Sequence, residues 1–132
     1  MKNIPVLFLF IILVGINLEA LAEEEIDVIK SKPATKFQLS SEEYLKTQLN
    51  SSESAKNLVW IVKRNGHYFW KSREDRKLDH VAGGLYHYFI DPKGGGYVKV
   101  EHGLDGKIEF LEHVGIGMTT LTYFGKAAVF NP

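Results

Sequence analysis

Residues 58–72 read LVWIVKRNGHYFWKS, and this stretch predicts a β-hairpin. Two runs of β-branched and aromatic residues flank the pair Asn65-Gly66. A type I′ turn needs a positive φ at both central residues, and an Asn-Gly pair adopts this conformation readily. Because a two-residue turn fixes the register, we expect five cross-strand pairs. These pairs are Arg64–His67, Lys63–Tyr68, Val62–Phe69, Ile61–Trp70 and Trp60–Lys71.

The rest of the chain predicts further short strands separated by turn residues. We expect strands over residues 85–90, 97–101, 107–114 and 118–124, and a short edge strand over 127–130. Residues 73–77 are charged and residues 81–84 contain two glycines, so we expect a connector and a loop there. Five or six short strands with turns at this spacing are typical of an antiparallel meander that forms a curled sheet, a small barrel or a sandwich.

One segment predicts a helix, from Ser40 or Ser41 to about Asn50. Ser40 and Glu43 have the spacing of a capping box, and Tyr44, Leu45 and Leu49 recur at helical spacing. A helix this short is marginal by itself in water, so its apolar stripe should pack on the sheet. The expected fold class is therefore mainly β with one N-terminal amphipathic helix.

The N-terminus has the three parts of a secretory signal peptide: Lys2, an apolar run over residues 4–18, and the small-x-small triplet at residues 20–22. A membrane anchor is the competing interpretation, but the apolar run is shorter than the ~20 residues that a spanning helix needs. We therefore predict a cleaved leader over residues 1–22, a poorly ordered linker over 23–38 and a single β-rich domain over 39–132.

The amino-acid composition limits the cellular compartments and the classes of partner that we expect for this protein. The chain has no cysteine, so it cannot use the disulfides of many small secreted animal domains. We predict an exported bacterial protein, periplasmic or secreted. The formal net charge is zero, which gives no support for a nucleic-acid partner or for attraction to anionic lipid. We therefore expect no nucleic acid as partner, and no membrane once the leader is removed.

The five histidines raise the question of a metal site. None of them has a second histidine at the i, i+2 or i, i+4 spacing of common metal ligands. A composite site could still form across neighbouring strands from His87, His102 and Glu112. Separate histidines that are solvated or hydrogen-bonded are the simpler interpretation.

The aromatic residues are the other candidates for binding. An aromatic surface could contact a protein partner or an apolar ligand, and the candidate contact residues are Trp60, Tyr68, Trp70, Tyr97 and Tyr123. The alternative is that these rings pack in the core or against one another. The hairpin register also places Lys63 over Tyr68 and Lys71 over Trp60, where cation–π contacts would stabilise two exposed rings.

No motif in the sequence predicts catalysis. There is no Gly-x-Ser-x-Gly elbow and no thiol nucleophile, and residues 94–96 lack the lysine and the helix of a phosphate-binding loop. We predict no catalytic residues and no cofactor. The leading hypothesis is a non-catalytic binding or interaction module for an unknown protein. The alternatives are a carrier of a small apolar ligand and a histidine-based metal protein or enzyme.

Overall fold

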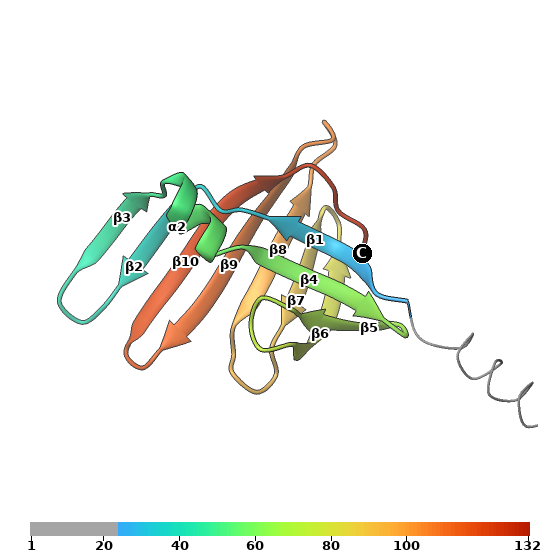
Figure 1. Ribbon diagram of the computed structural model, residues 1–132, viewed down its shortest axis with the longest axis horizontal. Helices are drawn as coiled ribbons and strands as arrows, with labels where there is room; N and C mark the ends of the chain where they lie inside the picture. Colours follow the sequence, from blue (N-terminus) through green and yellow to red (C-terminus); the bar gives the residue numbers. More distant parts are fainter. Residues whose placement is uncertain (1–23) are drawn as a thin grey trace, which may run out of the picture.

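In the computed structural model, residues 24–132 form an antiparallel sheet of ten strands that curls into a half-barrel (Figure 1). The strands are β1 (Ile26–Ser31), β2 (Thr35–Leu39), β3 (Tyr44–Gln48), β4 (Val59–Arg64), β5 (His67–Trp70), β6 (Arg76–Gly83), β7 (Tyr86–Ile90), β8 (Tyr97–His102), β9 (Ile108–Ile116) and β10 (Thr119–Ala127). A short helix, α2 (Ser51–Lys56), joins β3 to β4. The predicted mainly β, antiparallel, curled fold is confirmed, but with ten strands instead of five or six.

The strand order is β1-β4-β5-β6-β7-β8-β9-β10-β2-β3. Strand β1 therefore lies beside β4, the chain crosses at residues 32–34, and β2 lies beside β10. Pro33 is fully buried at this corner. Ser31 Oγ donates to the Lys126 carbonyl at 2.7 Å, and the Ala34 N–H donates to the Phe124 carbonyl at 2.7 Å. These bonds hold the β1–β2 corner against β10, so the β1 edge of the sheet lies close to β10.

The predicted hairpin is formed by β4 and β5, and its register is confirmed. The pairs from Arg64–His67 to Ile61–Trp70 are those expected from the turn, and the Lys71 N–H donates to the Trp60 carbonyl at 2.8 Å. Asn65 has φ 52° and Gly66 has φ 77°, so both central residues have the positive φ of a type I′ turn.

The core lies on the inner, concave face of the sheet. Alternate residues of each strand point inward, as the predicted alternation of β8 and β9 requires; Val98, Val100 and Phe110 are all buried. Residues 127–130 do not add a strand, because β10 ends at Ala127. The chain instead turns back along β1, where the Asn131 N–H donates to the Val28 carbonyl at 2.9 Å.

The predicted helix over residues 40–50 is wrong. Residues 40–43 form the turn between β2 and β3, and the Ser40 hydroxyl accepts from the N–H groups of Glu42 and Glu43, as a helix cap would. The observed helix, α2, starts ten residues later. Its cap is Asn50, whose Oδ1 accepts from the Glu53 N–H at 2.9 Å. Three apolar residues at helical spacing are a weak signal, and pairing of β3 with β2 outweighs it.

Two other segments differ from the expected organisation. Within the predicted linker over 23–38 lie β1 and most of β2, and Val28 and Ile29 of β1 are buried. The expected connector and loop around residues 73–84 contain β6. The predicted leader over residues 1–22 lies outside the described residues. No helix within residues 24–132 is long and apolar enough to cross a lipid bilayer.

Candidate functional site

The outer, convex face of β7–β10 and β2 carries an aromatic surface. Because successive strand residues point to opposite faces, the neighbours of the buried core residues point outward. We name this surface the outer band, and it consists of Phe37, Tyr86, Tyr88, Tyr97, Leu111 and Phe124. The solvent-facing side of an antiparallel sheet is usually polar, so this composition is unusual.

All members of the outer band except Tyr86 lie in two cross-strand rows, which also contain Lys99, His113 and Thr122. One row runs through the cross-strand partners Tyr88, Lys99, Leu111 and Phe124. A second row runs through Tyr97, His113, Thr122 and Phe37. Each residue in a row therefore lies beside the next one on the same face of the sheet.

Ring contacts hold the second row in place. The Tyr97 ring stacks on the His113 ring with 5.2 Å between centroids, and His113 Nδ1 lies 3.0 Å from the Thr122 hydroxyl. At the far end of the row, Phe37 meets Phe124 edge-to-face at 5.3 Å. The rings are thus fixed by their neighbours, although Phe124 remains 38% exposed.

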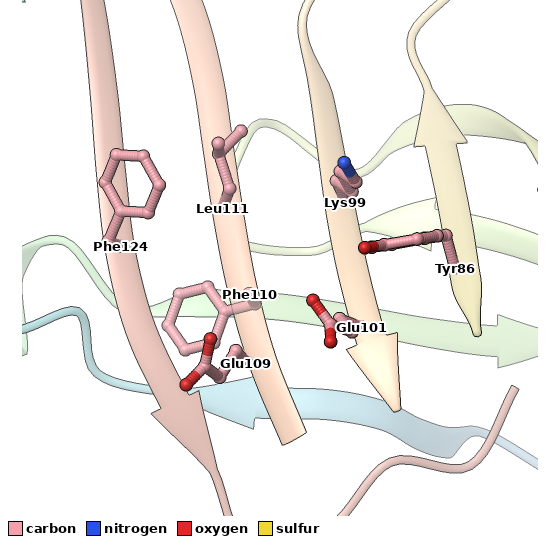
Figure 2. Close-up of a pocket in the computed structure, with 7 residues that line it drawn as sticks. All are labelled: Tyr86, Lys99, Glu101, Glu109, Phe110, Leu111 and Phe124. Carbon is pink, nitrogen blue, oxygen red and sulfur yellow. The ribbon is translucent and has the colours of Figure 1, made fainter. Parts of the chain in front are cut away.

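Next to the outer band lies a hollow of about 160 Å³ (Figure 2). Figure 2 shows the carboxylates of Glu101 and Glu109 on neighbouring strands below Lys99, with Tyr86 at one side and Phe124 at the other. The Lys99 ammonium lies 4.3 Å from the centroid of the Tyr86 ring, so this ring already carries a cation–π contact. The hollow is smaller than the 300–1,000 Å³ typical of pockets for whole small molecules. It is the right size for one side chain.

Two like charges face each other in this hollow. Glu101 and Glu109 are direct cross-strand partners on β8 and β9. Like charges in such positions are destabilising. Within residues 24–132 neither carboxylate forms an ion pair. A cationic group placed between them would remove the repulsion, and the aromatic rings at either side would contact its apolar part.

The structure does not bring the five predicted contact residues to one surface. Tyr97 belongs to the outer band. Trp60 lies on the outer side of β4, where its ring contacts Lys30 and Lys71 at 4.0 and 4.5 Å. Tyr68, Trp70 and Tyr123 point into the half-barrel, and Tyr123, expected to be exposed, is only 4% exposed. The predicted cation–π contact of Lys63 with Tyr68 is present at 5.3 Å.

Trp70 and Tyr123 lie beside an ion pair between buried Glu112 and the partly exposed side chain of Arg73. Glu112 is buried, and its two carboxylate oxygens accept from Trp70 Nε1 at 3.0 Å and from the Arg73 guanidinium at 2.6 Å. Burial raises the pKa of the Tyr123 phenol; the nearby Arg73 guanidinium opposes this increase and the Glu112 carboxylate adds to it. Both oxygens of Glu112 bind side chains of the protein itself, so we assign this network a role in stabilising the fold.

Two of the three predicted metal ligands lie at one end of the half-barrel, and the third does not. His87 and His102 both approach the ring of Phe130, with centroids 4.9 and 6.2 Å away, whereas Glu112 binds Trp70 and Arg73. His87 Nδ1 instead lies 2.9 Å from Nε2 of His80. Over residues 24–132, no three His, Cys, Asp or Glu side chains are arranged to hold a metal ion.

A wider depression of about 710 Å³ lies beside the loop that joins β7 to β8, and two of its charged residues, Arg76 and Asp91, form an ion pair. Buried Asp91 accepts from Arg76 NH1 at 3.0 Å and from the Lys93 N–H at 2.9 Å. Burial by itself would raise the pKa of Asp91, but the backbone N–H groups of Gly94 and Lys93, together with Arg76, lower it below its usual value. This is the geometry of a stabilised loop.

Most of the outer band was missed by reasoning from the sequence. The alternation of residues 97–101 and 107–114 places Lys99, Glu101 and Glu109 on the outer side of their strands, and this signal was available. Their proximity depends on the pairing of β8 with β9, which alternation does not specify. Comparison of the chain with models of protein families, with curated proteins and with solved structures found no match.

Proposed function

We propose that this chain is an exported, non-catalytic interaction module, acting in the periplasm or outside the cell. Its outer band binds a protein partner that inserts an arginine or lysine side chain between Glu101 and Glu109. The observation that carries the proposal is the unpaired, like-charged pair Glu101–Glu109 beside solvent-facing aromatic rings. The export part of the proposal rests on the N-terminal sequence pattern.

The geometry favours a protein over the other ligands considered. The interior is filled by buried side chains such as Trp70, Phe89 and Val100, which leaves the outer surface for binding. The hollow on that surface matches one side chain, and aromatic residues that surround an arginine are common centres of protein interfaces. An aromatic face could also stack on a sugar, and the experiment below separates the two.

The first test is binding of the labelled protein to an array of short peptides and to an array of glycans. We expect enrichment of peptides in which arginine or lysine stands beside aromatic or aliphatic residues. The double variant Glu101→Gln/Glu109→Gln should weaken this binding at least tenfold, because truncating a buried charge contact at an interface has an effect of this order. Binding should also weaken as the salt concentration rises.

A matched control removes two carboxylates elsewhere. Glu24→Gln/Asp105→Asn changes the net charge equally, and both positions are exposed and lie outside the outer band. This control should bind peptides like the unmodified protein. Two results would refute the proposal. One is selective binding to glycans that is unchanged in the Glu101→Gln/Glu109→Gln variant, and the other is peptide binding that both double variants reduce equally.

A further inference from the structure

A second hollow, of about 440 Å³, adjoins the one that holds the two facing glutamates. The linings of both hollows include Glu109, Phe110 and Phe124, so the two form one continuous groove. The added part is lined by Lys32 and Lys126, together with uncharged residues of the β1–β2 corner and of β10. The groove therefore carries carboxylates in one half and ammonium groups in the other.

The charged residues of this groove lie in one row across the sheet. Glu101 on β8 pairs with Glu109 on β9, and Glu109 pairs with Lys126 on β10. Because neighbouring strands are about 4.8 Å apart, the row presents two negative charges and then a positive one within about 10 Å. Lys32 lies beside the end of this row, since its carbonyl oxygen would be 3.1 Å from a Cβ at Gly125.

The two lysines have no anionic partner of their own. Neither Lys32 nor Lys126 forms an ion pair with another residue of 24–132, and both are exposed. Glu109 is in register with Lys126, but in the proposed complex this carboxylate contacts the cationic side chain of the partner. Two neighbouring positive charges then remain at this end of the groove. A carboxylate supplied by the partner would complement them.

The separation of the two halves matches a short spacing along an extended peptide. From the midpoint of Glu101 and Glu109 to Lys126 is one and a half strand separations, or about 7 Å. In an extended chain, residues i and i+2 point to the same face and are about 6.7 Å apart. A peptide that crosses the strands can thus place a basic side chain in the first hollow and an acidic one, two residues away, beside the lysines.

We propose that the partner segment is extended and carries a basic and an acidic residue two positions apart. This inference rests on the proposed function, because the basic side chain occupies the hollow between Glu101 and Glu109. Lys126, with Lys32 beside it, selects the acidic residue. The opposite charges of the two halves also fix the orientation in which the segment lies across β8, β9 and β10.

Fluorescence anisotropy with labelled peptides tests the inference on the protein purified in the form that the cell produces. The peptides have capped ends and carry one core between two tyrosines: Arg-Ser-Asp, Asp-Ser-Arg, Arg-Ser-Ser, Arg-Asp-Ser or Arg-Ser-Arg. At least one of the first two cores should bind about threefold to fivefold more tightly than Arg-Ser-Ser, the effect of an exposed ion pair. Arg-Asp-Ser should bind like Arg-Ser-Ser, because adjacent side chains of an extended chain point to opposite faces.

Reversal of the lysine charges should change this preference. Lys126→Glu should abolish the preference for the acidic residue, and Lys32→Glu/Lys126→Glu should make Arg-Ser-Arg the tightest of the peptides. Lys93→Glu is exposed on the loop between β7 and β8 and changes the net charge as Lys126→Glu does. This control should keep the original order of affinities. Circular dichroism identifies a variant that fails to fold, and Lys126→Gln then replaces it.

The same titrations separate failure of this inference from failure of the proposed function. The inference is wrong, and the proposed function stands, if binding requires the arginine and Glu101 with Glu109 but the Asp and Ser cores bind equally. An acidic preference that the lysine variants leave unchanged would also overturn the inference. If binding of every peptide is independent of Glu101 and Glu109, the proposed function fails and the inference fails with it.

Discussion

Trp70 on β5 donates its indole N–H to Oε2 of Glu112 on β9 at 3.0 Å, although β6, β7 and β8 separate these strands in the sheet. The contact therefore crosses the interior of the half-barrel. Arg73, in the connection after β5, donates to the other oxygen of the same carboxylate at 2.6 Å. This network joins β5 and the residues after it to β9 across the interior. It gives each oxygen of the buried Glu112 carboxylate a hydrogen-bond partner.

Removal of Arg73 should therefore destabilise the protein. Arg73→Ala leaves the buried Glu112 carboxylate without its cation. Because the Arg73 side chain is 31% exposed and water can replace part of its effect, the expected loss of unfolding free energy is about 1–3 kcal/mol, below that of a fully buried pair. Urea denaturation at neutral pH measures the loss. Adding Glu112→Gln to Arg73→Ala should recover part of it, because the amide is uncharged. A loss below about 0.5 kcal/mol for Arg73→Ala would contradict the role assigned to this pair.

The stability of the fold should decrease in mild acid. Burial lowers the pKa of His80, with further contributions from His87 and Lys63, and burial followed by His102 lowers the pKa of His87. The unfolded chain therefore binds protons more readily than the folded chain. Above about pH 6.5, the ordinary pKa of histidine, the free energy of unfolding is retained. As the pH falls below that value the free energy of unfolding decreases, until the pH is below the pKa values of His80 and His87 in the folded protein.

Melting temperatures measured from pH 8 to pH 5 test this expectation. The charged and titratable groups that face the His80–His87 pair are Lys63, Tyr68 and His102. His80→Gln/His87→Gln should flatten the dependence. Asp91, whose pKa is also lowered, loses its stabilising effect only at more acidic pH, below about 4. A flat profile for the unmodified protein would contradict the prediction.

The β4–β5 turn should tolerate no β-branched residue at its second position. Gly66 has φ 77°, and a Cβ built there meets no atom within 4 Å, so substitution tests backbone strain alone. Gly66→Val should lower the unfolding free energy by about 1–3 kcal/mol. Gly115→Val, also in open space but without a positive φ, is the matched control and should have a small effect. Equal effects of the two substitutions would argue against the type I′ turn.

Gly125 should be intolerant of substitution for a different reason. A Cβ at this position of β10 would lie 2.5 Å from Cζ of Phe110 and 3.1 Å from the Lys32 carbonyl oxygen. Gly125→Ala should therefore destabilise by about 1–3 kcal/mol through overpacking where the β1–β2 corner meets β10. Phe110→Leu/Gly125→Ala should lose less than the sum of the single variants in a double-mutant cycle. Additive losses would mean that the two residues do not compete for this space.

Tertiary contacts decided most of the candidate site. Of the predicted contact residues only Tyr97 lies in the outer band, because the sequence does not distinguish an aromatic residue that fills the half-barrel from one that covers its outside. Tyr123 shows the difficulty: it alternates with Phe124, and the direction in which β10 faces determines which ring is buried. Likewise, the pairing of Glu101 with Glu109 depends on the connection between β8 and β9, whose conformation was not predicted.

The sequence by itself determined the β4–β5 register, the β class of the fold and the inward direction of Val98, Val100 and Phe110. These features follow from local rules: an Asn-Gly turn has few conformations, and strand side chains alternate with a period of two. Only the tertiary structure decided that residues 44–48 form an edge strand instead of a helix, and that β1 pairs with β4 while β2, next along the chain, pairs with β10. Such choices depend on contacts between residues far apart in the chain. The energy of those contacts exceeds the small local preference of a few apolar residues for a helix.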